Sequence, residues 1–192
     1  MSMLMACVVS LLVVTSASSA KDTKAEQAQA IIEKAIQAHG GAKNLAKLKA
    51  VRTKIDGTAE IGGGLVWFTA ELATRLPDRH RVTFTVAGET ASSLRVISGD
   101  KAWHRADDRT EELKDEPLAD VRASMHQTYV RSLLPLLKDS AFRLSPLGEV
   151  KVQDRPAVGV QVEVKGRTDI NLYFDKTTGL LVKAERRGLG PH

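Results

Sequence analysis

The segment from Thr168 to Arg187, TDINLYFDKTTGLLVKAERR, constrains the fold most strongly, because it has the pattern of two strands joined by a tight turn. Apolar residues recur at every second position, and they are Ile170, Leu172, Phe174, Leu180, Val182 and Ala184. Such alternation is typical of strands with one buried and one solvated face. Asp175 and Gly179 suit the turn, since Asp can bond its own backbone and Gly tolerates positive φ. The pattern recurs along the chain and predicts a large antiparallel sheet with one apolar face.

Residues 1–20 have the pattern of an export signal. They carry no charged side chain, include an apolar run from Leu4 to Val14, and end in small residues at Ser18 and Ala20. We therefore expect cleavage after Ala20 and a periplasmic or otherwise exported mature chain without an integral membrane span. Cys7 weakly resembles the cysteine of a lipoprotein signal, but the apolar run follows it, so we interpret Cys7 as part of the signal core.

Residues 21–192 are long enough for a single domain with a real core. Cys7 is the only cysteine, so the expected mature chain has no disulfide, thiolate nucleophile or cysteine metal site. The net charge of +5 favours anionic partners such as phospholipid headgroups, or it merely keeps the chain in solution. Aromatic residues make up 4% of the chain, too few for the stacking platforms of nucleic-acid readers. We expect a monomer with no nucleic-acid partner, cofactor or metal.

Helices and a strand meander open the expected mature chain. Helical spacing from Lys24 to Ala38 predicts an amphipathic helix that His39 and two glycines end, and a short second helix follows within residues 24–48. Residues 51–106 predict short antiparallel strands separated by Gly, Pro and Asp. The apolar positions that we place on the inner side of these strands are Val66, Phe68, Leu72, Val82, Phe84, Leu94 and Val96.

Residues 116–138 interrupt the run of strands. Apolar side chains recur there at spacings of three and four, which predicts an amphipathic helix. They are Leu118, Val121, Met125, Tyr129 and Leu133. Pro117 suits the first turn, and Pro135 should kink or break the helix near its end. A second strand set over residues 141–187 adds an apolar face that includes Val160, Val162, Leu172 and Phe174.

Catalytic motifs are weak. The sequence lacks the nucleophile elbow, the phosphate-binding loop and the zinc-protease helix, and Gly62-Gly63-Gly64 has the pattern of a turn. His104 with Asp107 or Asp108 could hold a metal or exchange protons. Because a third ligand is missing, we favour the interpretation that His104 is an ordinary histidine at a strand end, beside a solvated acidic turn.

Other polar residues have structural interpretations. We expect His39 to help end its helix and His126 to lie on the surface. Arg75, Arg79 and Arg81 cluster around one turn, where they are candidates for an anion site or a lid contact. Contact with the carboxylates of a neighbouring strand is the alternative.

Three stretches resemble the outer-membrane lipoprotein carrier (LolA/LolB-like) superfamily: SGDKAW at 98–103, RPAVGV at 155–160 and LYFDKTTGLL at 172–181. The resemblance covers most of residues 51–187. It implies a mainly β, α+β fold in which a strongly curved antiparallel sheet, or unclosed β-barrel, has helices covering its concave face. It also implies that Arg75 or Arg52 corresponds to the strand arginine that contacts the lid in the carriers. If helices and sheet leave a gap, the gap is a pocket for acyl chains, and otherwise it is an ordinary core.

Three functional hypotheses follow. The first is an exported, non-catalytic binding protein for a lipid or an acylated protein, with the apolar sheet face and the 116–138 helix as its site. The second is an envelope accessory or sensor domain that binds a protein partner, through a free sheet edge. The third is a hydrolase or metal enzyme that uses His104 and Asp107.

Overall fold

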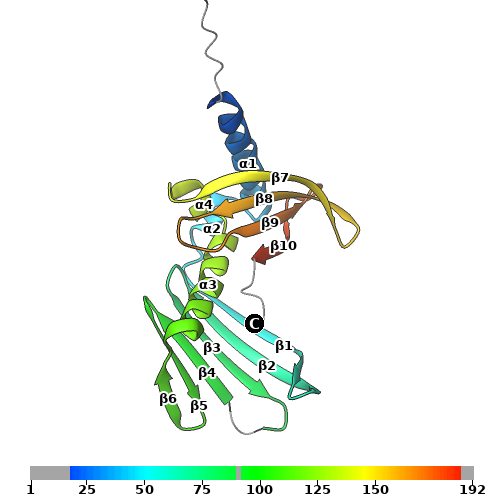
Figure 1. Ribbon diagram of the computed structural model, residues 1–192. Coiled ribbons are helices and arrows are strands. Elements are labelled where there is room, and N and C mark those ends of the chain that lie inside the picture. Colours follow the sequence, from blue (N-terminus) through cyan, green and yellow to red (C-terminus); the bar gives the residue numbers. More distant parts are fainter. Residues whose placement is uncertain (1–17, 90–91, 187–192) are drawn as a thin grey trace, which may run out of the picture.

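Two antiparallel sheets with a long helix running between them make up the structure, a computed structural model that describes residues 18–89 and 92–186 (Figure 1). The helices are α1 Ser18–Ala38, α2 Ala42–Leu45, α3 Asp115–Arg131 and α4 Pro135–Lys138. The strands of the first sheet are β1 Val51–Ile61, β2 Gly64–Arg75, β3 Arg79–Val86, β4 Ser92–Ser98, β5 Lys101–Ala106 and β6 Arg109–Glu112. Those of the second are β7 Arg143–Val152, β8 Arg155–Glu163, β9 Ile170–Asp175 and β10 Leu181–Arg186. Most of the expected signal peptide lies outside the described residues.

The predicted fold class is confirmed. Hydrogen bonding groups the strands into a six-stranded sheet of order β1-β2-β3-β4-β5-β6 and a four-stranded sheet of order β10-β9-β8-β7, with no closed barrel among the described residues. The two sheets contain the two predicted strand sets, 51–106 and 141–187, with α3 and α4 between them in the chain. The sequence predicted one continuous curved sheet, and did not predict that the two sets hydrogen-bond only within themselves.

Helix α1 covers the four-stranded sheet and fills its core. Its apolar stripe is buried against the sheet, and the members of this cluster from the two elements are Ala28, Ile32, Ala35, Ile36, Val160, Val162, Ile170, Leu172 and Phe174. The helix ends at Ala38 because Gly40 and Gly41 adopt φ of +96° and +83°, the left-handed conformation that glycine favours. Both the helix and its glycine stop were predicted, although the helix begins at Ser18 instead of Lys24.

The predicted helix over residues 116–138 is two helices. It breaks at Ser132–Leu134, where Leu133 takes a φ of +65°. Pro135 is the first residue of α4, a position where its missing N–H costs no hydrogen bond. The proline therefore breaks the helix as expected, and the break lies just before it, because proline cannot occupy the interior of a continuous helix.

The closing hairpin has the predicted turn but a different phase in its second strand. Asp175 Oδ1 accepts hydrogen bonds from the backbone N–H groups of Thr178 and Thr177 at 2.7 and 3.0 Å, and these bonds lower the pKa of Asp175. A bulge between Leu181 and Lys183 then shifts the register. Leu181 before the bulge and Ala184 after it both pack on the core, the latter as expected, whereas the other expected inward residues, Leu180 and Val182, are 43% and 39% exposed. An extra residue in a bulge reverses the alternation that follows it.

The described part of the chain contains no helix that is long and apolar enough to cross a membrane.

Candidate ligand-binding site

The two faces of the six-stranded sheet differ in charge over β1, β2 and β3. Directly opposite residues of an antiparallel pair share a face, so the register assigns each side chain. The face that we call the inner face carries Val51, Thr53, Ile55, Gly57, Ala59 and Ile61 of β1, Gly64, Val66, Phe68, Ala70, Leu72 and Thr74 of β2, and His80, Val82, Phe84 and Val86 of β3. Every Lys, Arg, Asp and Glu of these three strands lies on the other, outer face.

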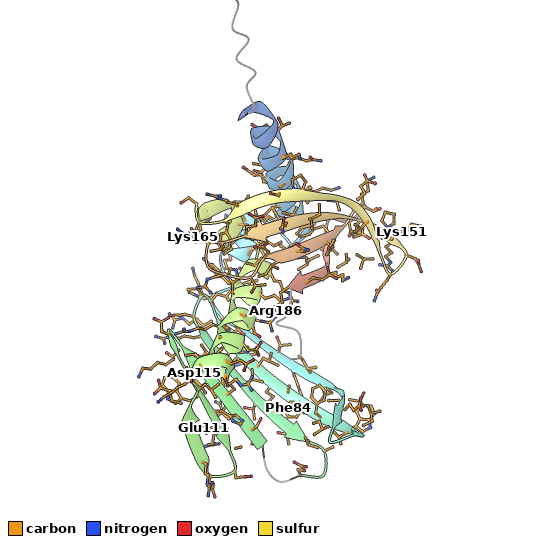
Figure 2. The ribbon with its side chains drawn as sticks, viewed as in Figure 1. Phe84, Glu111, Asp115, Lys151, Lys165 and Arg186 are labelled. Atoms are coloured by element: carbon orange, nitrogen blue, oxygen red, sulfur yellow. The ribbon has the colours of Figure 1, made fainter. Side chains whose placement is uncertain are left out.

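The inner face is apolar and only half covered. Phe68 and Phe84 stack at its centre with ring centroids 4.9 Å apart and an interplanar angle of 25°. Gly57 lies opposite Phe68 and leaves room for its ring, since a Cβ there would be 3.3 Å from Phe68 Cζ. Val51 and Ile55 of the edge strand are 47% and 43% exposed. Figure 2 shows Phe84 on the broad part of this sheet, away from the four-stranded one. The face therefore presents hydrocarbon to solvent.

Helix α3 covers the other end of the inner face. Val121 and Met125 are buried against Ile97 of β4 and Ala102 of β5, with Leu118 partly buried beside them. Ile97 and Ala102 belong to the inner face because they are opposite His80 and each other. The predicted helix residues Leu118, Val121 and Met125 thus do meet the sheet, but over β4 and β5 and not over β1 to β3.

Polar contacts hold α3 on both of its sides. Arg186 of β10 bonds Asp120 at 2.9 Å, and on the opposite side Arg122 donates to the backbone oxygen of Asp100 at 2.6 Å. The Asp120 and Arg122 side chains are 59% and 46% exposed. Exposed pairs of this kind contribute about 0–1 kcal/mol each, so the apolar cluster supplies most of the attachment to the sheet.

A cavity of about 500 Å³ lies where the middle and end of α3 pass the turn before β3, the end of β4 and the segment before β7. Arg122, His126 and Tyr129 line it from the helix, and Phe142 lines it from the chain before β7. His126 stacks on Phe142 with ring centroids 6.2 Å apart.

The surface position predicted for His126 is wrong. This side chain is 8% exposed, because α3 turns it towards Phe142 and not towards solvent. Burial, with a smaller contribution from the positive charge of Arg167, lowers the pKa of His126. The imidazole is therefore held in its neutral form, which cannot attract an anion by charge.

The structure does not bring the other predicted apolar binding residues together in one site. Val66, Phe68, Leu72, Val82 and Phe84 share the inner face, as expected. Leu94 and Val96 do not: they are opposite Thr83 and Arg81, so they lie on the outer face. The strand sequence SSLRVIS has apolar residues on both faces, and the pairing with β3 decides that Ile97 points inward.

All but one of the remaining predicted residues belong to a filled core. Val160, Val162, Leu172 and Phe174 of the four-stranded sheet are 0–2% exposed under α1. Leu133 is buried in the same cluster, and Tyr129 lines the cavity instead of the sheet. The helices leave no opening on the face of this sheet that bears these residues, because α1, the end of α3 and α4 fill it. Val51, Ile55 and Ile61 of β1 also lie on the inner face, although they were not among the predicted binding residues. Their alternation with the charged residues of this strand was a usable signal.

The polar candidates are dispersed. His104 has Glu111 at 3.9 Å, and Asp107 lies in the following turn with a φ of +50°. Within residues 18–89 and 92–186 no three His, Cys, Asp or Glu side chains are grouped as metal ligands. Arg75, Arg79 and Arg81 lie on the outer face, so the predicted lid contact is wrong: α3 packs on the inner face. His39 Nδ1 lies 2.8 Å from the Ala35 carbonyl, at the end of its helix as expected.

Comparison with known proteins supports the fold. No family model and no curated protein matches the sequence. A LolA superfamily protein from Nitrosomonas europaea aligns with 86% of this chain and 73% of its own, with a TM-score of 0.51 and 12% identity. A DUF1329 family protein from Desulfovibrio piger aligns with 86% of this chain and 75% of its own, at a TM-score of 0.49 and 9% identity. A putative outer membrane lipoprotein-sorting protein domain from Vibrio parahaemolyticus aligns with 84% of this chain and 72% of its own, at a TM-score of 0.44 and 10% identity.

The first of these matches shows that the chain has the LolA-superfamily fold, which confirms the resemblance seen in the sequence motifs. At 12% identity, this likeness establishes the fold only.

Proposed function

We propose that this LolA-like protein is an exported, non-catalytic binding protein that holds an acyl chain, of a lipid or of an acylated protein, on the inner face of β1, β2 and β3. The observation that carries the proposal is the uncharged, half-open inner face around the stacked pair Phe68 and Phe84. Burying apolar surface is worth roughly 25 cal/mol per Å². A hydrocarbon chain laid along this face would bury its own surface and that of Val51 and Ile55 together.

The chemistry of the face favours a hydrocarbon over a polar ligand. Its polar groups are few, and two of them satisfy each other, because Thr74 Oγ1 and His80 Nδ1 are 2.7 Å apart. Burial lowers the pKa of His80, which keeps that imidazole neutral as well. An acyl chain needs no hydrogen-bond partner, so it can cover such a surface without leaving buried polar groups unpaired.

Helix α3 is the movable cover in this proposal. Its first half is attached to the sheet through Val121, and Met125, just past the midpoint, adds to this contact. Its last turn is anchored in the main core through Val130. Movement of the first half would extend the inner face across Ile97 and Ala102. Met125 suits a surface that packs in two ways, since its thioether side chain is flexible.

The test uses two neighbouring residues of β3 that point to opposite faces. Phe84→Asp places a charge on the inner face, and Thr83→Asp, the matched control, places the same charge on the outer face. We expect Phe84→Asp to weaken binding of a fluorescent fatty acid at least about ten-fold, or about 1.4 kcal/mol, and Thr83→Asp to change it less than about two-fold. Mass spectrometry of an organic extract should also find a lipid in the wild-type protein. Equal affinities of the two folded variants would refute the site.

A protein partner is the second candidate function, and the edge strand β1 favours it. β1 pairs with β2 on one side and has no partner strand on the other within the described residues. An unpaired edge can accept a strand from another chain, and the exposed side chains of Val51 and Ile55 would be covered by it. A photo-crosslinker at Ile55 that captures one envelope protein, in material without extractable lipid, would favour this function over acyl binding.

A further inference from the structure

Four arginines gather on the outer face of the six-stranded sheet, behind the proposed acyl-binding face. Arg52 of β1, Arg75 of β2, and Arg79 and Arg81 of β3 all occupy outer positions in the strand register. Arg75 and Arg79 are directly opposite each other. Arg52 and Arg81 are both opposite Ala73, one on each neighbouring strand. The four guanidinium groups therefore project from two adjacent rows of side chains.

These two rows form the walls of a groove of about 380 Å³. One wall contains Arg52, Ala73, Arg81 and Val96, and the other contains Arg75, Arg79 and Ser98. The row between them is Val51, Thr74, His80 and Ile97. Its side chains point to the inner face, so its backbone forms the floor of the groove. The small side chain of Ala73 leaves space between Arg52 and Arg81.

The positive charge of this groove is not neutralised by the protein. In the part of the chain that the structure describes, none of the four arginines forms an ion pair or a side-chain hydrogen bond, and all four are exposed. Nearby outer-face carboxylates have other neighbours. Asp56 contacts Lys54 at 3.8 Å, and Glu71 is opposite the same lysine. Like charges directly opposite each other destabilise a sheet, so Arg75 and Arg79 oppose folding unless an anion neutralises them.

We propose that this arginine groove binds a phosphate group carried by an organic or lipid ligand. Guanidinium groups bond phosphate oxygens in a bidentate fork geometry. A phosphate group also offers up to two negative charges and three acceptor oxygens, which several arginines can share. The aliphatic stems of the arginines, with Ala73 and Val96, provide apolar contacts for the part of the ligand that bears the phosphate. Because the groove opens on the outer face, it can be occupied independently of the inner face.

The test compares two double substitutions that remove the same charge. Arg79→Gln/Arg81→Gln removes it from the groove, and Lys151→Gln/Lys165→Gln removes it from two exposed positions outside the groove, one in β7 and one in the loop after β8, which lie at opposite ends of the four-stranded sheet in Figure 2. One arm titrates inorganic phosphate calorimetrically against chloride at equal ionic strength. The other sediments the protein with vesicles of phosphatidylcholine mixed with phosphatidylglycerol. Binding to both assigns the site to phosphate in general, and binding to vesicles alone assigns it to a lipid headgroup.

We expect the wild-type protein to bind in at least one arm. The arginine variant should lose about ten-fold in affinity and the lysine variant less than about two-fold. Equal losses in the two variants would show that net charge alone attracts the anion, and that result would overturn the proposal, as would the absence of binding in both arms. Arg52→Gln is the second variant if the double arginine variant does not fold, and it should weaken binding in the same direction.

Discussion

Replacing Val121 by Ala should release the first half of α3 from the sheet without unfolding the domain. Val121 is 4% exposed and packs on Ile97 and Ala102. The substitution removes two methyl groups worth about 0.8 kcal/mol each, or about 1.6 kcal/mol together. Since RT is about 0.59 kcal/mol, amides that exchange when α3 opens should exchange about fifteen-fold faster. The exposed ion pairs of the helix are too weak to compensate for this loss.

The same helix provides a matched control at Val130, which is 0% exposed and belongs to the main core. Val130→Ala removes the same atoms, so it should lower the free energy of global unfolding by a similar amount. Hydrogen exchange followed by mass spectrometry separates the two cases. Val121→Ala should accelerate exchange in the first half of α3 while β8 stays protected, and Val130→Ala should accelerate both. If Val121→Ala accelerates β8 as much as α3, the helix is ordinary core and the movable cover is refuted.

Two further predictions concern pH and packing. The ordinary pKa of histidine is about 6.5, and burial makes the pKa of His126 lower. As the pH falls through about 6.5, the unfolded chain therefore binds a proton that the folded chain does not, and the free energy of unfolding decreases. His126→Phe, which keeps a ring against Phe142, should reduce this loss in urea unfolding, and an unchanged pH dependence would contradict it. Gly159→Ala should lower stability by about 1–3 kcal/mol, because its Cβ would lie 2.9 Å from Leu147 Cβ and 3.1 Å from Tyr173 Cε1; an unchanged melting temperature would argue against that packing.

The two proposals assign different ligand chemistry to the two faces of the six-stranded sheet, an acyl chain to the inner face and a phosphate group to the outer face. The inner face of β1 to β3 is uncharged, and the outer face of the same strands carries the four arginines. An acylated ligand with a phosphate group has the same two chemistries. The faces are separated by the thickness of one sheet, so one short ligand cannot span both, and the two experiments test them separately.

Much of the local structure could be predicted from the sequence because it depends on neighbouring residues. Alternation located the strands, although the β5–β6 hairpin was missed because β6, RTEE, has no apolar residue. The glycines at 40 and 41 marked the end of α1, and Asp175 with Gly179 marked the turn of the closing hairpin. The motif likeness predicted the superfamily fold. These signals depend on interactions within a few residues, so they do not depend on the tertiary contacts of the rest of the chain.

The sequence by itself therefore determined which residues share a face within the regular strands of the first sheet, where α1 ends and that Pro135 interrupts a helix, but not the phase of β10, which a bulge shifts. Only the tertiary structure decided which faces are covered. Pairing between strands turned Leu94 and Val96 outward and Ile97 inward. Packing of α1 filled the face that bears Val160 and Val162, while the face that bears Phe68 and Phe84 stayed half open. Periodicity specifies the two sides of a strand, but which side is buried depends on helices that are distant in sequence, and their position is set by the packing of the whole domain.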